Sequence, residues 1–208
     1  DASRPFEIEI VPNHGGGTVL YFGLIDFVKE RRETGVVVGS TPAGRSPGAA
    51  TIKCLVWDLD NTLWDGILVE DGPGKIRLRE GVVDVIKGAD ARGILNSIAS
   101  KNNHDDAMQA LRAFGIDEYF LYPQIQWQPK SQSVARIAQL LNIGVDTLAF
   151  IDDQAFEREQ VKAVLPQVTV IDAACFSEIV AWPEWNAPVT AESRSRRAMY
   201  REQQQRDT

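Results

Sequence analysis

The chain has 208 residues, of which 44% are hydrophobic and 25% are charged, and these values exclude a disordered, collagen-like or coiled-coil protein and favour one globular core. No apolar run is long enough to cross a bilayer, so we expect no membrane partner. The 22 basic and 29 acidic side chains give a net charge of -7, which disfavours general nucleic-acid binding. A small anionic substrate therefore needs a local cation.

The two cysteines, Cys54 and Cys175, are too few for a disulfide framework, and no leading basic-then-apolar segment of the secretory type is visible. We therefore expect a reducing, cytoplasmic setting. Because the first residue is Asp1 rather than Met, the sequence is also compatible with a piece of a larger polypeptide.

Glycine and proline cluster at residues 39–48, just before a strongly patterned region begins. Three segments are expected on this basis: an N-terminal appendage and linker (1–51), a core (52–175) and a charged helical extension (176–208). Within the appendage, the pattern predicts a strand at 6–11 and a helix at 21–32.

From Ile52 onward, apolar runs of strand length alternate with helical patterns, as in a parallel sheet wrapped by crossover helices. We therefore expect an α/β fold with a Rossmann-like sheet flanked by helices. The predicted strands are 52–57, 94–99, 148–151 and 168–171, and the predicted helices are 81–92, 105–114, 131–141 and 155–164. Gly115 and the stretch Asn142-Ile143-Gly144 are the expected C-terminal stops of two of these helices.

The segment between Thr62 and Gly81 carries a hairpin-like turn at residues 71–74, Asp-Gly-Pro-Gly. We expect this segment to form a short flap over the site. No other insertion is long enough for a separate cap domain, so the site should be open to a large substrate.

Ligands of such a sheet bind beyond the carboxyl ends of its strands, and polar residues follow several of the predicted strands. The first predicted strand runs into Asp58 and Asp60. Period-two alternation sends both carboxylates to the same side, which makes a hard-oxygen site suited to Mg²⁺. A second strand runs into Ser100 and Asn102.

Two further groups complete the set. Lys130 stands at the start of a predicted helix, where its ammonium and the free backbone N–H groups could hold an oxyanion. Another apolar strand ends in Asp152 and Asp153. Each pattern alone is weak, but together, in this order at these strand ends, they indicate a catalytic site.

The chemistry that needs this combination is phosphoryl transfer, in which a carboxylate must approach a phosphate of like charge. Acidic side chains hold Mg²⁺ against that repulsion, while Lys130 and Ser100 bind the charged oxygens. In this hypothesis Asp58 attacks phosphorus, and Asp60 protonates the leaving oxygen and later activates water. Asp60 must then hold a proton through its surroundings.

The expected metal ligands are therefore drawn from four carboxylates: Asp58, Asp60, Asp152 and Asp153. We favour Asp153 as the direct ligand from the late pair, with Asp152 in support. Thr62, Trp64 and Asn102 are the expected substrate contacts, although the tryptophans Trp57, Trp64 and Trp127 more often pack in a core or at its rim.

These residues resemble the haloacid dehalogenase (HAD) superfamily, over roughly residues 52–172. The four matching motifs are Asp58-Leu-Asp-Asn-Thr62, Ser100, Lys130 and Asp152-Asp153. Longer stretches are similar to the FkbH-like branch of that superfamily. They include Asp-Leu-Asp-Asn-Thr-Leu-Trp-Asp-Gly, Glu70-Asp71-Gly72, Ser100-Lys-Asn, Trp127-Gln-Pro-Lys130, the segment from Phe150 to Glu159, and Arg-Ala-Met-Tyr-Arg-Glu-Gln at 197–203.

The resemblance implies a Mg²⁺-dependent HAD fold without a large cap. It also implies transfer of a glyceryl unit from 1,3-bisphosphoglycerate to the phosphopantetheine thiol of an acyl carrier protein, with phosphate release, in polyketide biosynthesis. One residue departs from the expected pattern, because Asp65 stands where a glycine is expected and adds a carboxylate near the entrance.

Two other functions remain open from the sequence. One is a plain HAD phosphatase with water as the acceptor. The other is a receiver-like signalling module that accepts phosphate without turnover, although such modules carry the acidic pair early rather than late.

The acyl group could also pass through an enzyme cysteine. Cys54 precedes Asp58 by four strand residues, roughly 13 Å at strand rise, so we expect a small buried apolar residue there and a structural role for Cys175. Direct attack by the carrier thiol avoids both. The basic tail with Arg194, Arg196, Arg197 and Arg201 is expected to be a solvated helix, with carrier docking as the alternative.

Overall fold

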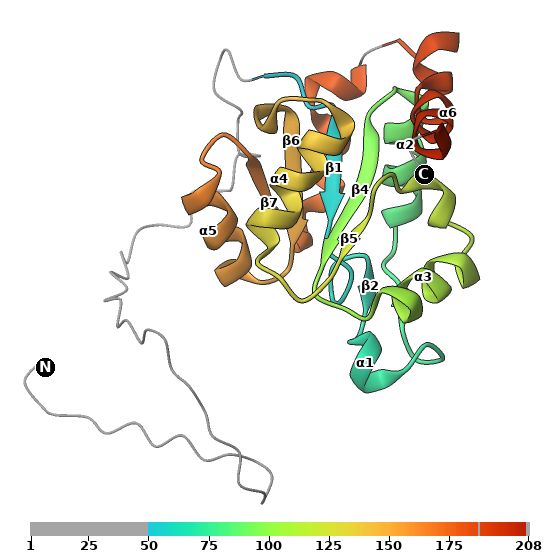
Figure 1. Ribbon diagram of the computed structural model, residues 1–208. Coiled ribbons are helices and arrows are strands. Elements are labelled where there is room, and N and C mark those ends of the chain that lie inside the picture. The colour runs from blue at the N-terminus through green and yellow to red at the C-terminus, as the bar shows by residue number, and fades with distance from the viewer. Residues whose placement is uncertain (1–49, 187, 207–208) are drawn as a thin grey trace, which may run out of the picture. The chain divides into compact units, whose positions relative to one another are not determined.

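The computed structural model describes residues 50–186 and 188–206, and a five-stranded sheet in the order β5-β4-β1-β6-β7 lies at their centre (Figure 1). All neighbouring strands in this sheet are parallel. The predicted α/β fold class, with a parallel sheet and flanking helices, is therefore confirmed. The strand predicted at 6–11 and the helix predicted at 21–32 lie outside the described residues.

The central strand β1 pairs with β4 on one side and with β6 on the other. Cys54 is in register with Leu95 on one side and with Leu148 on the other, so the carboxyl ends of β1, β4 and β6 meet at one edge. The strands are β1 (Cys54–Trp57), β4 (Leu95–Ser100), β5 (Gln124–Ile125), β6 (Leu148–Asp152) and β7 (Thr169–Asp172). Four of them match the predicted strands within two residues, whereas β5 is too short to show a periodic pattern.

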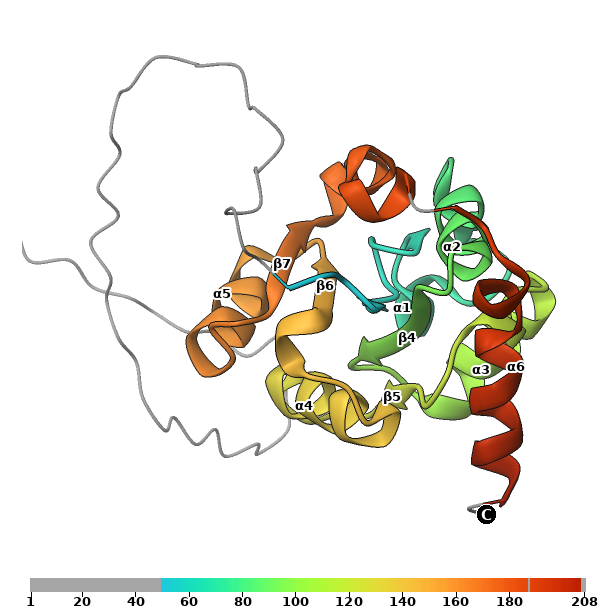
Figure 2. The ribbon, with the colours of Figure 1, turned by 90° about the horizontal axis from the view of Figure 1, so that it is seen from above.

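Helices cover both faces of this sheet (Figure 2). Leu55 and Trp57 of β1 pack in the cluster that includes α2 (Val82–Ala91) and α3 (His104–Ala113). Cys54 and Val56 pack in the other cluster, with α4 (Lys130–Leu141) and α5 (Ala155–Val164). Alternate residues of β1 therefore pack in two different hydrophobic clusters, one on each face of the sheet, because successive side chains of a strand point to opposite faces. All four helices match the predicted ranges within one residue.

Both predicted helix stops take the left-handed conformation. Gly115, after α3, has a φ of 68°, and Asn142, after α4, has a φ of 51°. Glycine and asparagine tolerate this region better than other residues, which is why they end helices.

The segment predicted as a flap forms a small antiparallel pair between β1 and α2. It consists of β2 (Trp64–Asp65), α1 (Leu68–Asp71) and β3 (Arg77–Leu78). Because it follows β1, this flap lies at the carboxyl edge of the sheet, beneath the strand arrowheads in Figure 1.

The C-terminal part packs at the opposite, amino edge. After two 3-10 helices, η3 (Ala173–Ala181) and η4 (Pro183–Asn186), the chain forms α6 (Ala191–Arg206). Ser193 Oγ donates to the carbonyl of Ala91 at 2.8 Å, and Arg196 donates to that of Gly93 at 3.2 Å. Both carbonyls precede β4, so α6 lies far from the carboxyl ends of the strands. Two more 3-10 helices are η1 (Asp117–Tyr119) and η2 (Val145–Thr147).

No helix among the described residues is both long enough and apolar enough to span a bilayer.

Candidate active site

A buried ion triad lies at the carboxyl edge, where three elements meet. Asp58 follows β1, Asp152 ends β6 and Lys130 begins α4. Lys130 Nζ lies 3.0 Å from Asp58 Oδ1 and 2.6 Å from Asp152 Oδ2. No side chain of the three is more than 4% exposed. The structure thus brings together residues that are 22 to 94 positions apart in the sequence as one charged unit.

One ammonium cannot fully neutralise two buried carboxylates, and the pKa values reflect this. Burial raises the pKa of Asp58 to about 7; Lys130 opposes the shift, and the charge of Asp152 adds to it. Burial also raises the pKa of Asp152, against the opposing charge of Lys130. Burial alone lowers the pKa of Lys130, but the two carboxylates outweigh it, so the Lys130 pKa is raised.

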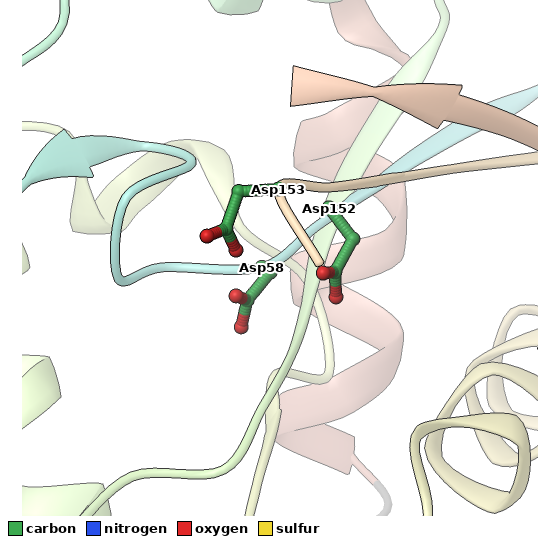
Figure 3. A group of neighbouring side chains, drawn as sticks. All are labelled: Asp58, Asp152 and Asp153. Carbon is green, nitrogen blue, oxygen red and sulfur yellow. The ribbon is translucent and has the colours of Figure 1, made fainter. Parts of the chain in front are cut away.

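Asp153 brings a third carboxylate to the same place. Oxygen atoms of Asp58, Asp152 and Asp153 lie within 4.8 Å of one another. Figure 3 shows the three carboxylates around a common space next to the ends of β1 and β6. Asp153 Oδ1 is buried and has no hydrogen-bond partner among the described residues.

These observations fit a divalent cation. Three carboxylates against one ammonium leave an excess of negative charge in a buried place, and an unpartnered carboxylate oxygen is available to bind a cation. Both oxygens of Asp152, in contrast, have partners, since Oδ2 binds Lys130 and Oδ1 accepts from Gln154 N at 2.8 Å. Asp58 and Asp153 would thus hold Mg²⁺ directly, and Asp152 would support them.

Asp60 has a different place from the one expected. The three-carboxylate group found among the described residues does not include it. Its Oδ1 accepts from Trp64 Nε1 at 2.9 Å and Leu68 N at 3.0 Å, and its Oδ2 accepts from Asn102 Nδ2 at 2.8 Å. All three contacts are N–H donors. They fix the orientation of the Asp60 carboxylate through both of its oxygens.

The other expected site residues contact this framework. Ser100 lies beside Asp58 and acts to lower the pKa of that carboxyl, against the larger effect of burial. Thr62 Oγ1 accepts from Asp153 N at 3.0 Å and so ties the β1 loop to the β6 loop. Thr62, Trp64 and Asn102 are all buried. The three expected substrate contacts thus position Asp60 and Asp153 in this structure.

Two residues outside the predicted set join the site region. Lys101 Nζ lies 2.6 Å from Glu157 Oε1 and links the end of β4 to the first turn of α5. Arg158 donates to the carbonyl of Asp152 at 2.8 Å and pairs with Asp172 at 2.6 Å, which fixes the turn that carries Asp153. The adjacency of Lys101 to Ser100 was a visible signal, but the partner of Lys101 is 56 residues away.

The two cysteines lie in environments that disfavour the thiolate. Cys54 is fully buried in the cluster with α4 and α5, and burial raises the pKa of its thiol. Burial raises the pKa of the Cys175 thiol as well, with Glu178 adding to the shift. Neither thiol is activated as a nucleophile.

The tail arginines lie at the other end of the sheet and are partly occupied. Arg197 pairs with Asp90 and with Glu118, and its guanidinium lies 4.6 Å from the ring centre of Tyr119. Asp65, the departure from the expected glycine, is 75% exposed on the flap, 3.6 Å from Arg79.

The sequence matches no protein-family model, and the comparison with curated proteins finds no match either. Solved structures, however, are similar. One is the N-terminal part of a Bacteroides fragilis protein that contains a phosphatase domain and is complexed with Mg. It is 29% identical, with a TM-score of 0.53, and the match covers 64% of this chain and 40% of that one.

A candidate phosphatase from Clostridium difficile is 14% identical, with a TM-score of 0.52 and coverage of 63% and 99% of the two chains. A HAD-superfamily hydrolase from Geobacter sulfurreducens is 13% identical, with coverage of 59% and 89%; its TM-score is 0.49, so no conclusion rests on it. The Bacteroides fragilis and Clostridium difficile structures are phosphatases by description, and this chain shares their α/β fold.

Proposed function

We propose that the protein is a Mg²⁺-dependent enzyme that releases phosphate from an acyl phosphate and transfers the acyl unit to an acyl carrier protein. The finer proposal, based on the motif resemblance, is glyceryl transfer from 1,3-bisphosphoglycerate in polyketide biosynthesis. The observation that carries the phosphate chemistry is the cluster of Asp58, Asp152 and Asp153 around one buried Lys130.

The residues of this chain have distinct parts in phosphate release by hydrolysis, the branch in which the acyl group leaves as a free carboxylate. When bound, Mg²⁺ neutralises the repulsion between the carboxylates and the phosphate oxygens. Lys130, in contact with Asp58 Oδ1, also faces the charge of an incoming phosphoryl group. Asp58 is the nucleophile toward phosphorus: a new O–P bond forms as the P–O bond to the leaving carboxylate breaks.

Asp60 acts in the following step. Held by three N–H donors, its carboxylate takes a proton from water as the water oxygen attacks the phosphorus on Asp58. The O–P bond to Asp58 then breaks and phosphate leaves. An acyl phosphate supplies a good leaving group without prior protonation, which suits a site in which Asp60 is oriented as a base.

Acyl transfer requires attack at carbon rather than phosphorus. The carrier thiolate attacks the acyl carbon, the C–O bond to the phosphate breaks, and inorganic phosphate leaves with the electron pair. The same cluster then stabilises the departing phosphate. Direct attack by the carrier thiol is consistent with the raised thiol pKa values of Cys54 and Cys175.

Plain phosphate hydrolysis is the second candidate, and a specific observation favours it. The similar Bacteroides fragilis structure contains a phosphatase domain and is complexed with Mg. The flap of β2, α1 and β3 is small, with a two-stranded sheet and one short helix, and is compatible with both functions.

The place where a carrier would dock follows from the two ends of the sheet. A carrier on α6 would bring its thiol to the amino edge, whereas Asp58 lies at the carboxyl edge. We therefore expect docking beside the flap. Reversing two tail charges, Arg194→Glu with Arg201→Glu, should leave carrier-dependent turnover unchanged, and a marked loss would assign docking to α6.

One experiment separates the candidate functions. The protein is incubated with 1,3-bisphosphoglycerate, Mg²⁺ and a holo carrier protein, and the intact masses of both proteins are measured. A glyceryl adduct on the carrier supports transfer. Free phosphate with an unmodified carrier supports hydrolysis, and a long-lived phosphoprotein without turnover supports a signalling module.

A further inference from the structure

Lys101 and Lys130 both lie near the carboxyl ends of the central strands, and they differ in how many partners their ammonium groups have. Lys130 is 4% exposed and lies between two buried carboxylates. The Lys101 side chain is 35% exposed and makes a single ion pair, to Glu157, within the described part of the chain. An ammonium has three N–H donors, so Lys101 retains donors that a ligand at this edge can reach.

The ion pair of Lys101 and Glu157 connects the segments that follow the two strands on either side of β1, the strand that precedes Asp58. Lys101 follows β4 and pairs with Glu157 of α5, which follows β6, and these two strands flank β1 in the sheet. Its chain neighbours are both parts of the site, since Ser100 lies beside Asp58 and Asn102 donates a hydrogen bond to Asp60. The Lys101–Glu157 pair therefore joins the two sides of the site entrance.

Glu157 pairs with Lys101 through only one of its two carboxylate oxygens. Its side chain is 6% exposed; Oε1 pairs with Lys101, while Oε2 is buried and has no hydrogen-bond partner in residues 50–186 and 188–206. A buried carboxylate with one cationic partner binds that partner firmly, because separating them leaves an isolated charge. The Lys101 ammonium is thus fixed in position rather than free to rotate on its flexible stem.

We propose that Lys101, anchored by Glu157, is a specificity residue that binds a second anionic group of the substrate, one that is not transferred to Asp58. This inference rests on the proposed function. The phosphate at Asp58 has Lys130 and the metal site to neutralise it, but a second phosphate or carboxylate must enter an acidic edge on a chain of net charge -7. It needs a cation of its own, and Lys101 is positioned beside the site to supply it.

The test compares two acyl phosphates that differ in this second group. Phosphate release is measured from acetyl phosphate, which has none, and from 1,3-bisphosphoglycerate, which has one, so that both hydrolysis and transfer are counted. Lys101→Gln should raise KM for 1,3-bisphosphoglycerate about tenfold, leave KM for acetyl phosphate within about twofold, and change neither kcat by more than about twofold. Lys101→Arg should restore most of the preference.

Two further variants keep the test decisive. Lys101→Gln leaves Glu157 unpaired and could unfold the edge, so Lys101→Gln with Glu157→Gln removes both charges together and should show the same KM selectivity. Lys87→Gln, on the exposed side of α2, is the matched control for loss of one positive charge and should have no effect on either substrate.

The outcomes are distinct. A wild-type protein that cleaves acetyl phosphate but not 1,3-bisphosphoglycerate, or a Lys101→Gln variant that changes both KM values equally or neither, overturns the role of Lys101 and leaves phosphate release intact. A wild-type protein that releases phosphate from neither substrate overturns the proposed function itself, and the inference with it.

Discussion

At each end of the sheet, one basic side chain pairs with two carboxylates, but the two clusters differ in their exposure to water. At the carboxyl edge, Lys130 meets Asp58 and Asp152, and at the amino edge Arg197 meets Asp90 and Glu118. The first two carboxylates are at most 4% exposed, whereas Glu118 is 51% exposed. Water screens the surplus charge at the amino edge, whereas at the buried carboxyl edge a proton on Asp58 or a bound cation must offset it.

Burial, rather than the number of acidic residues, therefore separates a cation site from a surface ion pair. The same contrast explains why Asp153 Oδ1 is buried without a partner, whereas Glu118 can exchange its partner for solvent. Four experiments would break or sharpen this comparison.

The largest expected effect is on phosphate release. Asp58→Asn removes both the nucleophile and a metal ligand while keeping the size of the side chain, so phosphate release should fall by about 10⁴-fold. Asp84→Asn, on the exposed surface of α2, is the matched control and should retain activity. Equal activity in both variants would exclude Asp58 as the nucleophile.

The second effect compares the two cations directly. Lys130→Met leaves two buried carboxylates unpaired and should lower the free energy of unfolding by about 3–5 kcal/mol without Mg²⁺. Arg197→Met at the half-exposed cluster should cost only about 1 kcal/mol. Urea unfolding in EDTA measures both, and similar losses would show that burial does not separate the two ends.

The third effect is on pH dependence. The Asp58 carboxyl has a pKa of about 7 in the folded protein against an ordinary value of 3.8, so between these values the folded state holds a proton that the unfolded state has lost. Raising the pH through this window therefore destabilises the metal-free fold, by at most about 1.4 kcal/mol per pH unit for one proton.

Asp58→Asn lacks this proton. Thermal unfolding in EDTA from pH 4 to 8 should thus show the variant gaining stability relative to wild type as pH rises. Mg²⁺ binding, which needs the ionised carboxylate, should strengthen in wild type over the same range. Parallel melting curves for the two proteins would contradict the buried, protonated Asp58.

The smallest effect concerns the exposed carboxylate of the flap. Asp65→Asn removes a charge near the entrance whose partner Arg79 is 3.6 Å away, so stability should change by less than about 0.5 kcal/mol. KM for an anionic acyl phosphate should fall by about twofold, because one source of repulsion is gone. A rise in KM would mean that Asp65 binds the substrate or orients Arg79 to do so.

The elements of the core were predictable because the pattern there is strong. Buried parallel strands appear as continuous apolar runs, and Gly115 and Asn142 end helices for a local steric reason. The carboxyl ends of β1, β4 and β6 followed from those strands, and with them the neighbourhood of Asp58, Ser100 and Asp152.

What the sequence could not supply are contacts between distant segments. The spacing of Asp58 and Asp60 predicted that both would be metal ligands. In the structure, the Asp60 carboxylate instead accepts hydrogen bonds from N–H groups of Trp64, Leu68 and Asn102, and it is not part of the three-carboxylate group. The basic pattern of the tail was visible in the sequence, but the position of the tail at the amino edge was not. That position depends on hydrogen bonds to groups about 100 residues away.

The central claim, that Asp58 and Asp153 hold a divalent cation with Asp152 in support, is tested most directly by diffraction from crystals soaked in Mn²⁺. We expect one anomalous peak between the carboxylates of Asp58 and Asp153, and its loss in crystals of Asp153→Asn. A peak centred instead on Asp60 or Glu157, or no peak at this edge of the sheet, would contradict the account.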